Sequence, residues 1–245
     1  MLEVKGLTKS FGALRACDGI DFDVKEGETH AVIGPNGAGK TTFISQLAGN
    51  LLPDTGTVRF AGADITALPA PKRARMGLAR SFQITSIYPE FSALDNVALA
   101  VQACSGHSFR FWRKARGDPA LTEPAQRVLE EVGLSSRKNI LAANLSHGEQ
   151  RQLEVAMALA TEPRLLLLDE PMAGMGTDES QRMIALLSKL KQRKTIILVE
   201  HDMDAVFRLA DRISVLVYGR VIATGLPETI KMNEEVRRAY LGESA

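Results

Sequence analysis

The chain has 245 residues, of which 45% are apolar, and its 30 basic and 29 acidic side chains leave a formal net charge of +1. This length suffices for one large domain or two small ones with a substantial core. The balance of charge argues against a protein whose main partner is a nucleic-acid backbone, because such a partner favours a basic surplus.

Short apolar runs predict the strands of this chain, and the connections between them predict two kinds of sheet. Three early runs are separated by turns rather than helices, which favours an antiparallel edge sheet. Four strand-like runs follow, and helical patterns lie between the late ones, at about 149–161 and 178–191. This alternation favours parallel strands covered on both faces, an α/β fold. The early runs are 2–4, 20–24 and 29–33, and the others are 57–60, 165–168, 195–199 and 213–217.

The segment from about residue 69 to residue 131 has helical stretches and few strand signals, which predicts a helical subdomain inserted in the parallel core. Within it, residues 105–119 are basic and aromatic. A solvated irregular insertion and a nucleic-acid-binding patch both fit that composition, and the first is the commoner outcome for a short charged run.

Residues 34–42 match the phosphate-binding pattern G-x-x-x-x-G-K-[ST]. A predicted strand precedes the match and a helical run at 42–48 follows it, so a chance lysine in a glycine-rich turn explains the pattern poorly. Glycines let backbone N–H groups close around phosphate oxygens, and the helix N-terminus adds partial positive charge. Lys40 would reach the β and γ phosphates of ATP, and the Thr41 hydroxyl would ligate Mg²⁺. The predicted nucleotide-binding residues of this loop are Gly34, Asn36, Gly37, Ala38, Gly39, Lys40, Thr41 and Thr42.

The apolar run 165–168 ends in two carboxylates, Asp169 and Glu170. A buried strand that stops at adjacent acids delivers them to the edge of the sheet where ligand sites of α/β folds lie. Asp169 would hold Mg²⁺, directly or through water, and Glu170 would polarise the attacking water as general base. Two surface acids at the end of a strand are the alternative, which the upstream phosphate loop disfavours.

Residues 145–152, Leu-Ser-His-Gly-Glu-Gln-Arg-Gln, predict a helix start in which Ser146 and Glu149 form a capping box. Because a helix start also attracts anions, the same residues suit a phosphate contact. The segment resembles the signature sequence of ABC ATPases, usually written LSGGQ, with His147 and Glu149 as departures. The resemblance implies that Ser146 and Gly148 contact the γ phosphate, and it assigns Glu149 to the same nucleotide-binding segment.

Other segments of the chain match further ABC elements, and they occur in the order expected along the sequence. Gln83 matches the glutamine that links the γ phosphate and Mg²⁺ to the helical subdomain, although a polar loop residue is its ordinary interpretation. His201, which follows a strand 32 residues after Asp169 (201 − 169), matches the switch histidine that contacts the γ phosphate. Phe11 matches the aromatic that stacks on adenine, with a core aromatic as the alternative. Residues 173–176 read Ala-Gly-Met-Gly where the family usually has S-A-L-D, so the aspartate of that loop is absent.

The resemblance extends to a subfamily, the ATPases of branched-chain amino acid, amide and urea importers, and the phenylalanine before Gln83 resembles the larger of its two ATPase types. Residues 77–83, 89–97, 171–175 and 238–242 carry it. It implies a P-loop NTPase core of the ABC type, with an antiparallel β subdomain and an inserted helical subdomain. The expected organisation is one ATPase domain over 1–245, with the helical subdomain at approximately 84–160.

The same resemblance implies the partners. We expect an ATP- and Mg²⁺-dependent ATPase that pairs with a second ATPase subunit, the same or a related chain, and with two integral membrane permease subunits. An extracytoplasmic solute-binding protein would act indirectly, and nucleic acid would not be a partner. The docking surface for a permease helix is expected near residues 84–91, with Tyr88, Pro89 and Phe91 as candidate anchors.

A soluble ABC-type ATPase linked to nucleic acid or ribosomes is the alternative function. Its ribosomal kind usually carries two ATPase domains and its DNA kind a long heptad insertion, and the sequence contains neither. A kinase-like interpretation of the phosphate loop leaves the signature and His201 unexplained.

The location follows from what the sequence lacks. The first residues have no signal-peptide pattern, and no stretch reaches the ~18 apolar residues of a membrane span. Cys17 and Cys104 form neither a metal spacing nor a disulfide framework, which favours a reducing compartment. The expected location is the cytoplasmic face of the inner (plasma) membrane, held there by the permease.

Overall fold

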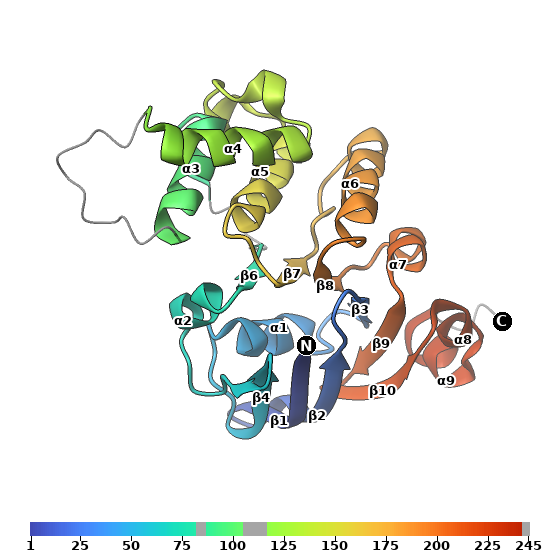
Figure 1. Ribbon diagram of the computed structural model, residues 1–245. Helices are drawn as coiled ribbons and strands as arrows, with labels where there is room; N and C mark the ends of the chain where they lie inside the picture. The colour runs from blue at the N-terminus through green and yellow to red at the C-terminus, as the bar shows by residue number, and fades with distance from the viewer. Residues whose placement is uncertain (82–86, 105–116, 242–245) are drawn as a thin grey trace.

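The computed structural model describes residues 1–81, 87–104 and 117–241, which form two sheets and the helices around them (Figure 1). The antiparallel sheet has the strand order β2-β1-β4-β5, and the larger sheet the order β10-β9-β3-β8-β7-β6. In the larger sheet β10 pairs antiparallel with β9, and the other neighbouring pairs are parallel. The strands are β1 (Leu2–Phe11), β2 (Leu14–Val24), β3 (Thr29–Ile33), β4 (Thr55–Phe60), β5 (Ala63–Asp64), β6 (Leu78–Arg80), β7 (Leu165–Asp169), β8 (Thr195–Val199), β9 (Arg212–Val217) and β10 (Arg220–Gly225).

The helices form separate groups around the larger sheet, as Figure 1 shows. One group projects from one side, a second covers the side of β8 and β9, and a third lies at the C-terminal end of the described chain. The first group is α3 (Ala93–Cys104), α4 (Pro119–Glu131) and α5 (His147–Leu159). The second is α6 (Thr177–Leu190) and α7 (Met203–Leu209), and the third is α8 (Pro227–Met232) and α9 (Glu234–Val236). The remaining helices are α1 (Lys40–Ala48) and α2 (Ala70–Arg75), with short 3-10 turns at Ser135–Arg137 and Ala142–Asn144 and a π turn at Arg237–Leu241.

The burial pattern explains which strands join which sheet. Every residue of β3, β7 and β8 is buried, as expected for parallel strands covered on both faces. The expectation of an antiparallel sheet at the start is confirmed for β1 and β2 but is wrong for β3. β2 alternates buried and exposed residues over much of its length, whereas β3 is buried throughout and pairs in parallel with β8 and β9. The chain therefore crosses between the sheets after β2, and β3 then leads into the phosphate loop.

The helical segment predicted at 69–131 contains α2, α3 and α4. It also contains a strand, β6, which the sequence analysis did not predict. β6 has three residues and owes its conformation to pairing with β7. Residues 105–116 of the basic aromatic segment lie outside the described residues. Its last residues begin α4, where the Asp118 side chain accepts a hydrogen bond from Ala120 N.

The helix α1 lies between the two sheets and packs into one of the apolar clusters of the core. Its apolar residues, Phe43, Ile44 and Leu47, share one buried cluster with residues of β1, β2 and β4 and with β7 and β8. A second cluster packs α3, α4 and α5 against α6 and the opposite face of β7 and β8. The first cluster therefore packs α1, the helix that follows the phosphate loop, against both sheets.

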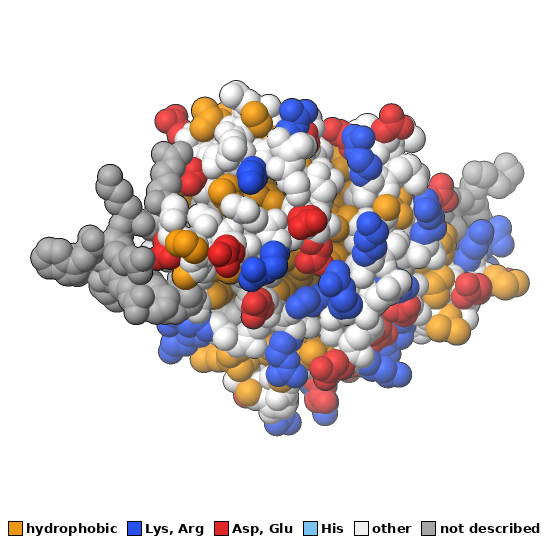
Figure 2. Space-filling view, turned by 45° about the horizontal axis from the view of Figure 1, so that its top comes forward, with side chains coloured by type: hydrophobic (Ala, Val, Ile, Leu, Met, Phe, Trp, Pro, Cys, Tyr) orange, Lys and Arg blue, Asp and Glu red, His pale blue; other side chains and the backbone are white. Residues whose placement is uncertain are grey.

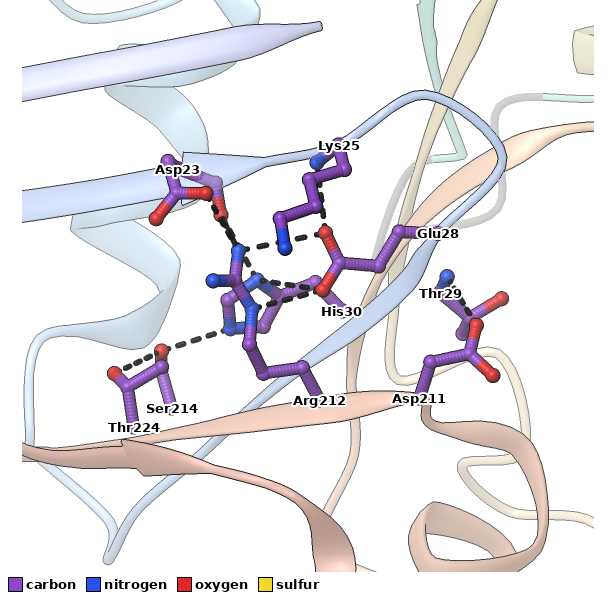
Figure 3. Close-up of polar contacts among 9 residues, drawn as sticks. All are labelled: Asp23, Lys25, Glu28, Thr29, His30, Asp211, Arg212, Ser214 and Thr224. Atoms are coloured by element: carbon purple, nitrogen blue, oxygen red, sulfur yellow. Dashed lines mark hydrogen bonds and ion pairs between the residues drawn. The ribbon is translucent and has the colours of Figure 1, made fainter.

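A buried polar network joins the two sheets at the start of β3 (Figure 3). The His30 Nδ1 lies 2.9 Å from the Asp23 carbonyl oxygen, which only accepts, so Nδ1 donates and Nε2 accepts from Ser214 Oγ at 2.8 Å. Burial, and next the charge of Arg212, lower the pKa of His30 to about 4, so the imidazole is neutral at pH 7. Arg212 pairs with both Asp23 and Glu28. The network fixes the first half of the strand that leads into the phosphate loop.

The surface shown in Figure 2 carries basic and acidic side chains interspersed rather than in separate fields. This matches the near balance of charge in the sequence. Within the described part of the chain, the structure holds no helix with the length and apolar character needed to cross a membrane.

Candidate functional site

The phosphate loop connects β3 to α1, and two of its glycines are required by backbone packing. A Cβ atom on Gly34 would lie 2.0 Å from the Leu216 carbonyl oxygen, and one on Gly39 would lie 2.1 Å from the Ala16 carbonyl oxygen. Gly39 also has a left-handed φ of 102°. Real Cβ atoms do not approach oxygen so closely, so a side chain at either position would displace the loop from β2 or β9.

Lys40 is the first residue of α1, and only 8% of its surface is exposed. Its Nζ donates hydrogen bonds to the carbonyl oxygens of Gly34, at 2.6 Å, and Pro35, at 3.1 Å. Burial lowers the pKa of Lys40, and the carboxylates of Glu170 and Asp169 oppose this effect. The cation is therefore held within its own loop, close to both acids that end β7.

A cavity of about 460 Å³ opens over the phosphate loop. Of the residues predicted from the sequence, it brings together Phe11, the loop residues 36–42 and Glu170. It also contains four residues that sequence analysis did not select: Leu14, Arg15, Ala16 and Tyr218. These come from the start of β2 and the β9–β10 turn, so the site is built from segments far apart in the chain.

Asp169 ends β7 and is 1% exposed. Its Oδ2 accepts a hydrogen bond from Arg80 Nη2 at 2.9 Å, and Arg80 Nη1 donates to Ser45 Oγ of α1 at 3.2 Å. Its Oδ1 is buried and has no hydrogen-bond partner among the described residues. A buried carboxylate oxygen left unpaired is a suitable ligand for a hard divalent cation, so the residues present fit Mg²⁺.

The contact of Asp169 with Arg80 was not predicted from the sequence. Arg80 precedes Gln83 by three residues, but only the pairing of β6 with β7 places its guanidinium beside Asp169. Gln83 itself lies outside the described residues.

Glu170 follows β7 with a left-handed φ of 50°, an uncommon conformation for a residue with a side chain. Its backbone N–H donates to the Val199 carbonyl oxygen at 2.9 Å, which ties it to the end of β8. This backbone turn directs the segment after Asp169 into the cavity, where Glu170 is a lining residue.

The buried Glu200, at the end of β8, supports the loop that follows Glu170. Its carboxylate accepts hydrogen bonds from Met172 N at 2.9 Å and His201 N at 3.2 Å. Burial raises the pKa of Glu200, while these hydrogen bonds act in the opposite direction. Its place next to His201 at a strand end was the only signal in the sequence that could have identified it.

The structure does not bring His201 into the cavity. Its side chain is 62% exposed, and it is not one of the described residues that line the 460 Å³ space. Its Nδ1 lies 3.9 Å from Glu200 Oε2.

The predicted capping box at the start of α5 is confirmed. Ser146 Oγ accepts from Glu149 N at 3.2 Å, and Glu149 Oε2 accepts from Ser146 N at 2.9 Å. Arg137 Nε also donates to Glu149, at 2.8 Å. The carboxylate of Glu149 is therefore engaged in holding the helix start.

A second carboxylate, that of Glu179 in α6, lies against the same helix start. Its Oε1 accepts from Ser146 Oγ at 3.0 Å, and its Oε2 accepts from Gly176 N at 3.4 Å. A Cβ atom on Gly148 would lie 2.5 Å from its Cδ. Ser146, Gly148 and Glu149 line a cavity of about 580 Å³ that shares no lining residue with the cavity over the phosphate loop.

Comparison with known proteins finds relatives that align with the whole chain. The family profile of the ABC transporter matches residues 17–173. A second profile, described as branched-chain amino acid ATP-binding cassette transporter, matches residues 220–245. The high-affinity branched-chain amino acid transport ATP-binding protein BraF of Pseudomonas aeruginosa is 40% identical, over 100% of this chain and 98% of the relative. LivG of Escherichia coli K12, of the same description, is 37% identical with the same coverage.

Solved structures show the same likeness. The ADP conformation of MJ1267, an ATP-binding cassette of an ABC transporter, is 29% identical with a TM-score of 0.87 over 99% of both chains. The dimeric structure of MJ0796, a bacterial ABC transporter cassette, is 25% identical with a TM-score of 0.81, over 93% of this chain and 99% of that one.

Proposed function

The chain belongs to the ABC transporter family of ATP-binding proteins, and on this basis we propose that its ATP hydrolysis drives the uptake of branched-chain amino acids through partner permeases. The observation that carries the solute class is the second profile match, over residues 220–245. The relatives named above are branched-chain amino acid transport proteins that align with the whole chain. This supports an importer over an ATPase linked to nucleic acid or ribosomes.

We assign the phosphates of ATP to the loop residues 34–42 and adenine to Phe11. Lys40 lines the cavity, and its ammonium group would bind the β and γ phosphates. Thr41, Asp169 and Gln83 would hold Mg²⁺, and the unpaired Oδ1 of Asp169 supports this assignment. The bound metal would neutralise phosphate charge.

We assign hydrolysis to Glu170, which would accept the proton of the attacking water. Gln83 and His201 would contact the γ phosphate once the site closes. The exposed position of His201 in the single subunit fits a group that meets its target only in the closed state.

The active site is proposed to be shared between two subunits. Within one chain, Ser146 and Gly148 line a different cavity from Lys40 and Thr41, so in this structure they do not cover a nucleotide held by residues 34–42. A second subunit would supply that cover, excluding water and placing donors at the γ phosphate. Because Ser146 donates to Glu179 in the single subunit, the Glu179 carboxylate would withdraw when phosphate arrives.

Mixing two inactive variants tests the shared site. Ser146→Arg removes the cover and Lys40→Ala removes the phosphate contact, so each homodimer keeps no intact site. A heterodimer keeps one, and we expect steady-state ATP hydrolysis to reappear on mixing. If Ser146 only caps its own helix, its loss costs about 1 kcal/mol of stability and mixing has no effect on turnover. Heterodimers that form, as judged by affinity tags, yet hydrolyse no ATP would contradict the shared site.

The coupling surface is proposed to lie on the helical part of the chain, for which we propose the limits 84–160 within a single ATPase domain of residues 1–245. Residues 84–86 of the predicted surface lie outside the described part. Tyr88 and Phe91 are both exposed, with ring centroids 5.5 Å apart, and they form an aromatic pair ahead of α3. Such a pair suits the apolar side of a cytoplasmic permease helix. The subunit would thereby sit on the cytoplasmic face of the inner membrane.

Cysteine crosslinking checks this surface in the complex with the copurified permease. The exposed Cys104 is first changed to serine, while Cys17 is buried and stays. Tyr88→Cys and Phe91→Cys are expected to crosslink efficiently to a cysteine-scanned cytoplasmic loop of the permease. Leu226→Cys, an exposed apolar position after β10, is the control. Crosslinks from Leu226→Cys alone would place the interface on the other side of the molecule.

A further inference from the structure

The turn between β9 and β10 holds an aromatic residue that the local backbone disfavours. Val217 and Arg220 are paired, so Tyr218 and Gly219 form a two-residue hairpin loop with φ values of 46° and 76°. A loop with both residues at positive φ favours Asn, Asp or Gly. Tyr218 is also 87% exposed, so core packing does not account for its ring.

This turn is fastened directly to the phosphate loop. Gly219 N donates to the Ala38 carbonyl oxygen at 2.9 Å, and Asp18 N donates to the Gly219 carbonyl oxygen at 2.8 Å. Arg220 Nε donates to the Asp18 carboxylate at 2.6 Å, which ties the β9–β10 turn to β2 as well. The backbone that carries Tyr218 is therefore positioned against the loop that would hold phosphate.

Tyr218 and Phe11 line the same 460 Å³ cavity, together with the phosphate loop. Phe11 is 50% exposed, so the cavity is bordered by two exposed aromatic residues, one at the end of β1 and one in the β9–β10 turn. An aromatic ring held in a strained backbone at a ligand cavity is typical of a residue kept for binding rather than for folding.

We propose that Tyr218 is a second aromatic contact for the nucleoside part of the bound nucleotide, complementing Phe11. The proposal rests on the proposed function, because it requires the phosphates to lie on residues 34–42. Base and ribose would cover the Tyr218 ring from water, while the phosphate contacts stay independent of it. Tyr218 thus contributes affinity for nucleotides but not for free polyphosphate.

Asparagine adopts the left-handed conformation more easily than tyrosine does, so the substitution Tyr218→Asn separates folding from binding. We expect the melting temperature to be retained or raised, while the Kd for ADP, measured by calorimetry, rises about 5- to 10-fold. The Kd for inorganic tripolyphosphate, which has no nucleoside, is expected to change less than about 2-fold. Tyr218→Phe, which keeps the ring, is expected to bind ADP nearly as the parent does.

Two further variants make the outcome decisive. Leu226→Asn removes another exposed apolar side chain outside this cavity and is expected to leave both Kd values unchanged. Lys40→Ala is expected to weaken ADP and tripolyphosphate together. Unchanged ADP affinity in Tyr218→Asn, or an equal loss for ADP and tripolyphosphate, would overturn the proposal while leaving the phosphate loop assignment intact. Unchanged affinities in Lys40→Ala would overturn both.

Discussion

Glu170→Gln is expected to leave ATP binding intact and to reduce steady-state hydrolysis by about 10²- to 10⁴-fold, the usual cost of losing a positioned general base. Glutamine has the shape of glutamate and still forms hydrogen bonds, but it does not accept the proton of the attacking water. The backbone at this position is held by the bond from Glu170 N to Val199 and lies in the left-handed region. The substitution therefore changes the chemistry of the side chain and leaves its placement unaltered.

The chain offers a matched control for this experiment. Glu162 precedes β7, has a φ of 51°, and lies at the opposite end of the strand from Glu170. Glu162→Gln repeats the same change in the same backbone conformation and is expected to hydrolyse ATP at nearly the parental rate. Release of phosphate from ATP, measured with saturating Mg²⁺, compares the two variants. Near-parental turnover in Glu170→Gln would show that another group activates the water.

Lys40→Ala is expected to raise the Kd for ATP roughly 10- to 100-fold, the effect of losing charge-assisted hydrogen bonds to phosphate. The Lys40 ammonium is buried and already held by the carbonyl oxygens of Gly34 and Pro35. Phosphate oxygens would therefore meet a cation that is already localised. Alanine leaves the backbone N–H groups of the loop but removes its positive charge.

Calorimetric titration with ATP measures this loss without any turnover. Lys191→Ala serves as the control because Lys191 Nζ also donates to a carbonyl oxygen, that of Leu209, but lies away from the cavity. It is expected to keep the parental Kd. An unchanged Kd in Lys40→Ala would argue against phosphate binding by residues 34–42.

Local pattern was enough to predict the parts of this protein that depend on neighbours in the chain. The apolar runs at 29–33 and 195–199 coincide with β3 and β8 to the residue. The capping box of Ser146 and Glu149 formed as predicted, since a helix start is specified by residues three apart. The phosphate loop was predicted from its sequence pattern, and Asp169 and Glu170 from their position at the end of an apolar run; the cavity brings residues 36–42 and Glu170 together.

The tertiary structure alone decided the contacts between segments far apart in the sequence. Pairing of β6 with β7 allows Arg80 to donate a hydrogen bond to Asp169. Packing of α6 beside α5 allows Ser146 to donate one to Glu179. The β9–β10 turn brought Tyr218 to the phosphate loop across nearly 180 residues of chain (218 − 39 = 179). Hydrophobic periodicity specifies which face of an element is buried, but not which partner covers it. Those partners are selected by strand register and side-chain packing of the whole chain, and they determine which polar groups meet at the site.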